Sequence, residues 1–420
     1  MTRRRFLNQT AILSSIFIVP RHVLGGAGYT APSDRLTLGF IGTGRQSHDL
    51  LEFFLNAGGI RILAACDVYK VKLNYFKVRV DDAQQESGTG CTAYHDFREL
   101  LARPDIDAVV IASPDHWHAV HAVRAAEAGK DIYCEKPLAH TIAEGRAIVE
   151  AVKKHNRVFQ TGSMQRSWSE FRQAVELVRN GYIGELKTVK VSVGGPPEPY
   201  DLPGEKLPVG LDWDFWLGPN SFDHYNNQLA PALPFKFWAK WRNYQPFGGG
   251  EMADWGAHMF DIVQWALDMD RSGPVRIVPP DGKDHPFLTY YYANGLPMVH
   301  EDFGTKNAIR FVGSKGTIEV KRGELTTTPV ALKDHPFTSQ EKRVYYSDNH
   351  YKDWLSAIRK RNAPICDAET GHRSATVCSL GNIAYALKRP LAWDPVKEEF
   401  KNDKAADILR SRKMRAPWIV

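Results

Sequence analysis

What the 420-residue chain lacks narrows the class of protein to which it belongs. Its five cysteines are an odd number without a Cys-x-x-Cys spacing, which argues against a framework of disulfides. No apolar run is long enough to cross a bilayer as a helix, and there are no repeats or low-complexity segments. The net charge is only +6 and no basic run stands out beyond the N-terminus, so nothing supports binding to nucleic acid. What is there is a globular chain, 43% hydrophobic, with the length of two domains.

The N-terminus departs from this mixed composition. Arg3–Arg5 are followed by a modest apolar run at Ala11–Val19. The order of residue types over Thr2–Asn8 resembles a twin-arginine export signal, apart from its last position, where lysine is commoner. We expect residues 1–33 to be a signal for the twin-arginine export machinery and a linker, and the protein to be periplasmic without a stable membrane anchor. The alternative is a basic N-terminus followed by an ordinary buried segment.

Residues 34–163 alternate between short apolar runs and helical patterns. The expected strands are 36–41, 60–66, 107–114, 130–137 and 157–163, and the expected helices are 50–55, 116–128 and 142–155. Strands that alternate with helices predict a parallel, doubly wound sheet, and therefore a Rossmann domain in an α/β protein.

The composition then changes. A long alternating strand is expected at 185–195, followed by an irregular stretch rich in Pro, Trp and Asn and by a helix at 251–269. Strand-like runs in hairpin order come next, with turns such as Asn294-Gly295. Residues 164–395 are therefore predicted to form a second α/β domain around a large, open, mostly antiparallel sheet. Its last helices return to the first domain, and 396–420 form a tail.

A glycine motif follows the first expected strand. Gly42-x-Gly44-x-x-Ser47 has serine where the dinucleotide-binding fingerprint has a third glycine, and serine is small enough to keep helix and strand close. The motif opens a helix and precedes Asp67, at the end of the second strand, by about 25 residues. This context favours a dinucleotide site over an ordinary glycine turn. The residues expected at the cofactor here are Gly42, Thr43, Gly44, Arg45, Gln46 and Asp67.

The carboxylate of Asp67 favours NAD over NADP. It can accept both ribose hydroxyls, and it repels a 2′-phosphate, although Lys70 lies close enough to soften that repulsion. An NAD that is tightly held is consistent with export of the folded protein. Four residues that follow the third expected strand are predicted to line the nicotinamide half of the site: Ser113, Pro114, Asp115 and His118. No carboxylate is spaced to complete a metal site with the nearby histidines, so no metal is expected.

The sequence Glu135-Lys136-Pro137 makes a more specific resemblance visible. A lysine at a strand end between a carboxylate and a proline resembles the signature of the glucose–fructose oxidoreductase / inositol dehydrogenase / MocA (Gfo/Idh/MocA) family. "GFIGTG", "ASPDHWHA", "CEKPLAHT", "YIGELKTVKV", "GGGEMADWGAHMFDIVQW" and "FVGSKGTIEV" stand in the expected order. The resemblance implies a Rossmann domain, a C-terminal α/β domain and NAD(P)-dependent oxidation of sugars, cyclitols or their derivatives. It also implies a homodimer or homotetramer, because the open sheet in this family often packs between subunits.

The resemblance implies three catalytic residues, Lys136, Asp254 and His258. We further expect Glu135, Lys136 and Gln165 at the cofactor. Two departures stand out. The chain has Asp115 where many members have Asn, and an anion beside a nicotinamide ring affects charge balance or substrate choice. The Trp/Pro-rich stretch 196–247 is extended, which makes transfer of a substrate from better-known members unsafe.

The chemistry of these side chains agrees with the resemblance. An imidazole titrates near neutral pH and can remove a hydroxyl proton, while an ammonium group stabilises negative charge on the oxygen. Asp254 and His258 are four residues apart and therefore share one helix face. We expect His258 to be the general acid/base, Lys136 its electrostatic partner and Asp254 their support. Lys136 as the proton carrier is the alternative, and Asp261 is expected to make a structural contact.

The sequence says less about the substrate than about the cofactor. Aromatic faces stack on sugar rings and arginines bind hydroxyls or carboxylates, although such tryptophans also pack cores. The candidates are Trp213, Trp216, Trp238, Trp241, Tyr244, Arg166, Trp168 and Arg172. Three hypotheses follow: an NAD-dependent sugar oxidoreductase that forms or reduces a keto sugar, a glycosidase that uses transient oxidation and elimination, and a non-catalytic sugar-binding protein. The presence of Lys136, Asp254 and His258 argues against the third.

Overall fold

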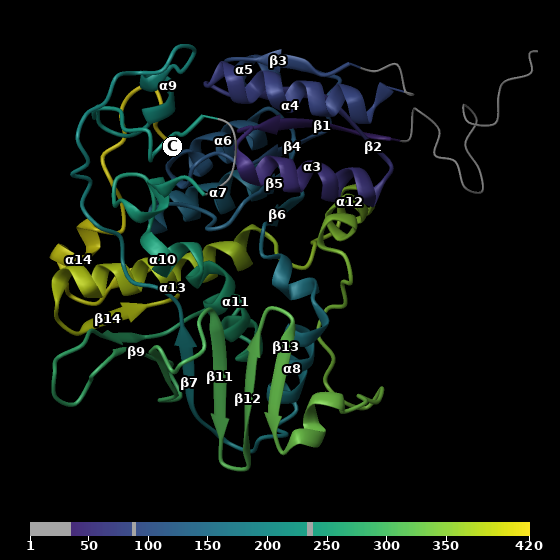
Figure 1. Ribbon diagram of the computed structural model, residues 1–420. Coiled ribbons are helices and arrows are strands. Elements are labelled where there is room, and N and C mark those ends of the chain that lie inside the picture. Colours follow the sequence, from purple (N-terminus) through teal and green to yellow (C-terminus); the bar gives the residue numbers. More distant parts are fainter. Residues whose placement is uncertain (1–34, 86–89, 233–237) are drawn as a thin grey trace, which may run out of the picture.

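The structure, a computed structural model, describes residues 35–85, 90–232 and 238–420. The expected export signal at 1–33 lies outside these residues. Two sheets organise the chain, and the long helix α13 (Ala368–Leu387) lies between the halves that they form (Figure 1). In the described part, no helix combines the length and apolar character needed to cross a membrane.

The first sheet has six strands in the order β3-β2-β1-β4-β5-β6, and each pair of neighbouring strands is parallel. The strands are β1 (Leu36–Ile41), β2 (Ile60–Cys66), β3 (Thr92–Tyr94), β4 (Ala108–Ile111), β5 (Asp131–Cys134) and β6 (Phe159–Thr161). The crossover helices are α3 (Arg45–Ala57), α4 (Lys70–Ala83), α5 (Phe97–Leu101), α6 (Asp115–Glu127) and α7 (Ile142–Lys154). The predicted doubly wound Rossmann sheet is confirmed.

Separate apolar clusters cover the two faces of this sheet. One joins α3 and α4 to α12 (His350–Lys360), whose Trp354 is fully buried. The other joins α5, α6 and α7 to the start of α13 through Ala368 and Ala375. The last long helices of the chain thus pack on the Rossmann half, one on each face. Burial on both faces explains why the strands read as continuous apolar runs.

Three elements of this half were not predicted: α4, β3 and α5. The apolar stripe of α4 consists of only Leu73, Phe76 and Val80 among charged neighbours, so its helical period is weak. Strand β3 is three residues long and exposes the side chains of Thr92 and Ala93. The exposed Val71, Tyr75 and Val78 spread apolar residues around α4 and obscure its helical period, and β3 is too short to show one.

The second sheet has nine strands in the order β13-β12-β11-β7-β10-β9-β8-β14-β15. Only the β7–β10 ladder is parallel among those that the structure describes, so the mostly antiparallel prediction is confirmed. The strands are β7 (Leu186–Ser192), β8 (Arg276–Val278), β9 (Leu288–Tyr291), β10 (Pro297–His300), β11 (Ala308–Gly313), β12 (Gly316–Lys321), β13 (Glu324–Thr328), β14 (Leu391–Asp394) and β15 (Glu399–Phe400). Its core packs against α8 (Ser169–Arg179), α13 and the helix that carries His258.

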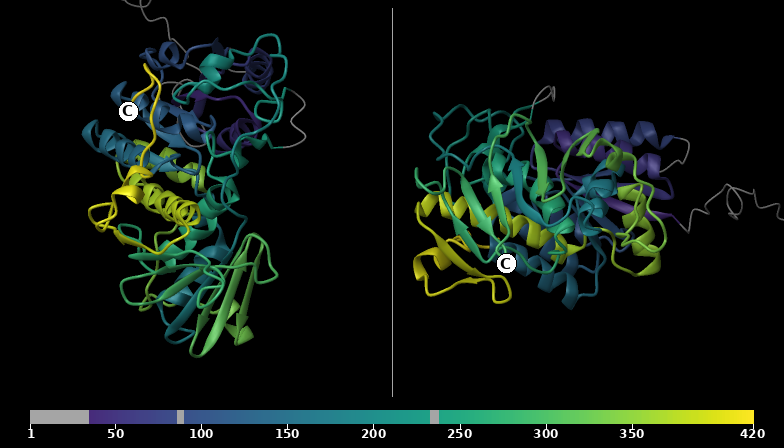
Figure 2. Two further views of the ribbon diagram at one scale, coloured as in Figure 1. Left: turned by 90° about the vertical axis from the view of Figure 1, so that its left-hand side faces the viewer. Right: turned by 90° about the horizontal axis from the view of Figure 1, so that it is seen from below.

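The helix predicted as one element at 251–269 is divided in two. α10 (Gly250–Asp254) ends before Trp255, and α11 (Gly256–Ala266) continues nearly in line, because Trp255 keeps helical dihedral angles. Every residue of α11 is buried. The tail contains α14 (Lys404–Ile408) and then runs along the Rossmann half (Figure 2).

Candidate active site

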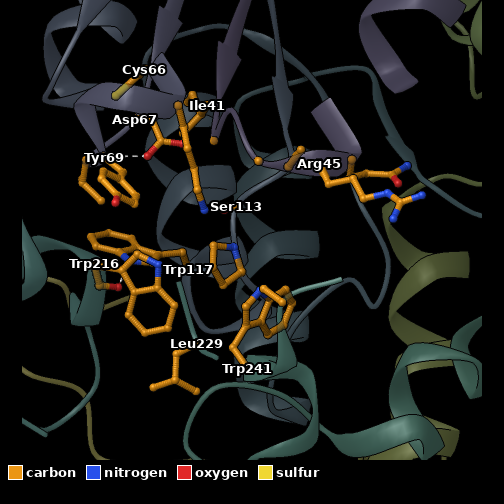
Figure 3. Close-up of a pocket in the computed structure, with 18 of the residues that line it drawn as sticks. Ile41, Arg45, Cys66, Asp67, Tyr69, Ser113, Trp117, Trp216, Leu229 and Trp241 are labelled. Carbon is orange, nitrogen blue, oxygen red and sulfur yellow. Dashed lines mark hydrogen bonds between the residues drawn. The ribbon is translucent and has the colours of Figure 1, made fainter. Parts of the chain in front are cut away.

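Two adjoining cavities lie at the carboxyl ends of the parallel strands. The first has a volume of about 350 Å³ and follows the ends of β1, β2 and β4 (Figure 3). The second has a volume of about 360 Å³ and lies between the ends of β4 and β5 and the α10–α11 pair. Their shared lining residues are Gln46, Ala112, Ser113, Trp238, Ala239, Trp241 and Arg242. The carboxyl end of such a sheet is where doubly wound folds bind ligands.

The glycine turn forms one wall of the first cavity. Gly42 has φ +87°, and a Cβ there would lie 2.6 Å from the backbone nitrogen of Ser113, so only glycine fits. A Cβ on Gly44 would meet nothing within 4 Å, because this residue faces open space in the cavity. The hydroxyl of Ser47 donates to the carbonyl of Gly42 at 2.6 Å and closes the turn. An open backbone surface at the N-terminus of α3 fits the pyrophosphate of a dinucleotide.

Asp67 is fixed at the end of β2 by the same turn. Its Oδ2 accepts hydrogen bonds from the backbone nitrogen and the hydroxyl of Thr43 at 2.7 and 2.9 Å, and its Oδ1 accepts from the backbone of Tyr69 at 2.8 Å. Thr43 is fully buried and does not line the cavity, and its hydrogen bonds hold Asp67 in place. The carboxylate of Asp67 lines the first cavity (Figure 3).

A stretch of the Trp/Pro-rich region closes the first cavity from the opposite side. We call residues 211–232 and 238–242 the cover segment; its Trp216, Leu229 and Trp241 face the strand ends (Figure 3). The indole nitrogen of Trp117 on α6 donates to the carbonyl of Trp216 at 2.9 Å. At its start, the cover segment pairs with the chain after β2 through a bridge between Tyr69 and Leu211.

The C-terminal tail holds the cover segment from outside. Arg415 donates to the carbonyls of Gly218 and Asp214 at 2.9 and 2.8 Å. The ring of Trp418 stacks on Phe215 in α9 (Trp213–Leu217) with centroids 5.0 Å apart. The cover over the first cavity is therefore anchored at both its inner and outer surfaces.

Lys136 and Asp254 meet in the second cavity. The Lys136 Nζ lies 2.5 Å from Asp254 Oδ1 and also donates to the Asp254 carbonyl at 3.0 Å. Arg242 Nε lies 3.4 Å from the same carboxylate oxygen. Burial opposes ionisation of this carboxyl, but the charges of Lys136 and Arg242 hold the pKa of Asp254 well below its usual range. Asp254 is thus a carboxylate shared by two cations.

His258 lies in the first turn of α11 and lines the same cavity. It is 4% exposed, and in the described part of the chain neither ring nitrogen has a hydrogen-bond partner. Burial, and then the charge of Lys136, lower the pKa of His258 well below 6.5, so the imidazole is neutral at physiological pH. The structure therefore brings all three expected catalytic side chains to one cavity, with a neutral imidazole beside an ammonium group.

Three more predicted residues line the second cavity. Glu135 accepts from the amide nitrogen of Gln46 at 3.0 Å, and Asp115, the first residue of α6, is 4% exposed. The ring of His118 lies between the carbonyl oxygens of Ser113 and Pro137, at 2.9 and 2.8 Å. His118 thereby connects the ends of β4 and β5, the strands that present Asp115 and Lys136. Of the other predicted residues, Arg45 and Pro114 line the first cavity.

Several predicted residues lie elsewhere. Gln165 lines neither cavity, since it is 1% exposed and its side-chain oxygen accepts from Arg322 at 2.9 Å. Arg166 is not free for a ligand, because it pairs with Asp261 and Asp270, and Asp261 has the structural contact expected for it. The other residues that line neither cavity are Trp168, Arg172, Trp213 and Tyr244.

Sequence reasoning missed Arg242, Arg322 and Glu251, which line the second cavity. Arg242 comes from η4 (Lys240–Asn243), and its guanidinium lies over the rings of Trp238 and Trp241, so the aromatic run was a usable signal. No signal marked Arg322, which reaches the cavity from a turn of the second sheet. Among the residues that the structure describes, no group of three His, Cys, Asp or Glu side chains is arranged to hold a metal.

Comparison with known proteins identifies the family. The sequence model for the oxidoreductase family, NAD-binding Rossmann fold, matches residues 36–163, and that for the oxidoreductase family, C-terminal alpha/beta domain, matches residues 198–420. The chain belongs to this Gfo/Idh/MocA oxidoreductase family and carries its NAD-binding Rossmann fold.

Individual relatives are more distant. The chain is 25% identical over 375 residues to the uncharacterized oxidoreductase YrbE of Bacillus subtilis, covering 86% of this chain and 95% of that protein. It is 30% identical over 183 residues to a glycosyl hydrolase family 109 protein of a Shewanella species, covering 43% of this chain and only 40% of that protein. Its fold is similar to that of the aldose-aldose oxidoreductase of Caulobacter crescentus, with a TM-score of 0.58 and 19% identity, over 85% of this chain and 99% of the other.

Proposed function

We propose that the protein is an NAD-dependent oxidoreductase that acts on a hydroxyl group of a sugar, glycoside or cyclitol and interconverts it with the ketone. The observation that carries this proposal is the convergence of Lys136, Asp254 and His258 in a cavity that adjoins the one at the glycine turn and Asp67. Oxidation of an alcohol requires a hydride acceptor and a proton acceptor side by side, and the two adjoining cavities provide space for both.

The first cavity supports a dinucleotide as cofactor. The turn Gly42–Gln46 offers open backbone for the pyrophosphate, and Asp67 offers carboxylate oxygens for the ribose hydroxyls. Asp67 also opposes a 2′-phosphate, which favours NAD over NADP. The cover segment lies over one side of the cavity, which supports a cofactor that stays bound between turnovers.

The second cavity supports acid–base chemistry. The nicotinamide, when bound, accepts or supplies hydride. The neutral imidazole of His258 removes the hydroxyl proton in oxidation and returns it in reduction. The Lys136 ammonium stabilises the negative charge that develops on the reacting oxygen. The Asp254 carboxylate holds Lys136 in place at 2.5 Å.

The substrate class rests on the shape of the second cavity and on relatives. Trp238, Trp241 and Trp255 line this cavity, and an arginine guanidinium lies over each of their rings, so the wall combines aromatic surface with donors for sugar hydroxyls. A structurally similar protein is an aldose-aldose oxidoreductase, which supports a carbohydrate substrate. Formation or reduction of a 3-keto sugar is our more specific proposal for the reaction, and glycosides are the substrates that an exported enzyme would meet.

A glycosidase with transient oxidation is the second candidate. The partial likeness to glycosyl hydrolase family 109 proteins favours it, as do the carboxyl groups of Asp115, Glu135 and Glu251 in the second cavity, which exceed the needs of hydride transfer. Release of the sugar from a glycoside without added cofactor supports this route; accumulation of a keto glycoside with reduced cofactor supports the first.

Location and assembly are also proposals. The twin-arginine-like order at Thr2–Asn8 supports export of the folded protein with its cofactor to the periplasm. The broad second sheet supports a homodimer or homotetramer, as expected from the family resemblance.

The test is a screen for cofactor reduction. The full-length protein, purified with its native cofactor content and supplied with NAD, is mixed with sugars, methyl glycosides and cyclitols while the absorbance of reduced nicotinamide is recorded. We expect a signal with a carbohydrate, and its loss in Lys136→Ala. No reduction by any carbohydrate, with bound cofactor present, contradicts the proposal.

A further inference from the structure

Asp115 differs from the other carboxyl groups at the strand ends. It lines the second cavity and is 4% exposed, yet its carboxyl group has no hydrogen bond or ion pair in the described part of the chain. Glu135 accepts from Gln46, and Asp254 pairs with Lys136. Buried polar groups are normally satisfied, so an unpartnered carboxyl that faces a cavity points to a partner supplied by the ligand.

The surroundings of Asp115 determine its charge. The charged groups that face it come from the cover segment, the end of β5 and α10: Arg242, Lys136, Glu135 and Asp254. The two cations lower the pKa of Asp115 and the two anions raise it. His118, on the same helix, is neutral because burial lowers its pKa to about 4. Burial has the largest effect, and it raises the pKa of Asp115 to about 8.

We propose that Asp115 is a specificity-determining residue of the second cavity that donates the hydrogen of a neutral carboxylic acid to an oxygen atom of the bound sugar. A protonated carboxyl has one O–H donor, and the Asp115 carboxyl makes no hydrogen bond with any described residue. An ionised carboxylate in the same place only accepts hydrogen bonds. The neutral acid therefore selects ligands that present a carbonyl, ether or hydroxyl oxygen at this point.

This inference depends on the proposed function only for the identity of the ligand. The protonation of Asp115 is a property of the protein, and donation is read from ligand binding. Both are measurable without turnover, so failure of the oxidoreductase proposal is distinguishable from failure of the inference.

Infrared difference spectra of the full-length protein test the protonation. We expect the carbonyl band of a protonated carboxylic acid at pH 7, its decline as the pH rises through about 8, and its loss in Asp115→Asn. Asp284→Asn, which changes an exposed aspartate far along the chain, is the matched control and keeps the band. If the wild type and Asp115→Asn do not differ at pH 7, Asp115 is ionised and the inference is wrong.

Binding of a methyl glucoside tests the donor. We expect the band to shift to lower frequency when the glycoside binds, and we expect Asp115→Ala to weaken binding about tenfold at pH 7, because one hydrogen bond is lost. Asp115→Asn keeps an N–H donor, so we expect it to bind the glycoside more tightly than Asp115→Ala does. Its affinity for the glycoside no longer falls above pH 8. Equal affinities of the wild type and Asp115→Ala, or an unshifted band in a saturated complex, contradict donation to the ligand.

Discussion

The buried ion pair behind α11 gives a prediction that needs no substrate. Arg166, from η3 (Met164–Ser167) after β6, binds both carboxylate oxygens of Asp261 at 2.8 Å and reaches Asp270 at 2.8 and 2.9 Å. The side chains of Arg166 and Asp261 are each 1% exposed, and the hydroxyl of Ser374 donates to Asp261 at 2.7 Å. This pair connects the edge of the Rossmann sheet to the helix that carries His258.

Asp261→Asn keeps the shape of the side chain but removes its charge. Removal of one partner from a fully buried pair costs about 3–5 kcal/mol of unfolding free energy, because the other charge remains buried without compensation. Asp270 still binds Arg166 from a position that is 26% exposed, so we expect the lower end, about 3 kcal/mol. Adding Arg166→Met removes the buried cation, which Asp270 alone does not fully balance, and the double variant is then no less stable than Asp261→Asn alone.

Urea unfolding followed by tryptophan fluorescence measures these differences. Glu127→Gln is the control, since it removes one carboxylate from an ion pair with Arg124 whose side chains are 42% and 41% exposed; it is expected to change stability by less than about 0.5 kcal/mol. A cost below about 1 kcal/mol for Asp261→Asn, or a double variant that is clearly less stable than Asp261→Asn, refutes the reasoning.

Three further predictions concern the two cavities. Gly42→Ala forces a Cβ to within 2.6 Å of the Ser113 backbone at φ +87°, so we expect purified protein with several-fold less bound nicotinamide and a lower unfolding midpoint. Arg415→Ala removes hydrogen bonds to the cover segment, so we expect roughly fivefold faster cofactor release in a displacement assay, and unchanged release contradicts the anchoring role. His258 acts as a base only above its folded pKa, which burial lowers well below 6.5; we therefore expect the sugar oxidation rate to stay level from pH 7 to 6, and a half-maximal rate near pH 6.5 contradicts this.

The sequence was sufficient where burial or turn chemistry leaves a local pattern. Leu36–Ile41 and Ile60–Cys66 are strands with the predicted bounds, because both faces of the sheet are covered and the runs are almost entirely apolar. The Asn294-Gly295 turn joins the predicted hairpin strands. Helix α4 was not predicted because it buries only three residues, Leu73, Phe76 and Val80.

Only some residues of the candidate site were predicted correctly, because the partner of a side chain often comes from a distant part of the sequence. Lys136 and Asp254 are 118 residues apart in sequence, and the family resemblance placed them together. Arg166 looked equally available for a ligand, but its partner Asp261 comes from 95 residues away. The predicted tryptophans also have different environments. Trp213 stacks on Trp216 in a buried cluster, whereas Trp241 lines both cavities. Composition alone does not distinguish these environments.

The nicotinamide content of the purified protein tests the central claim most directly. Full-length protein is incubated with NAD, freed of unbound nucleotide and denatured, and the nicotinamide released is quantified per chain. The fit of the glycine turn and Asp67 to a dinucleotide predicts close to one molecule per chain, with a marked loss in Gly42→Ala. Protein that retains no nicotinamide, either as purified or after incubation with NAD or NADP, contradicts the account.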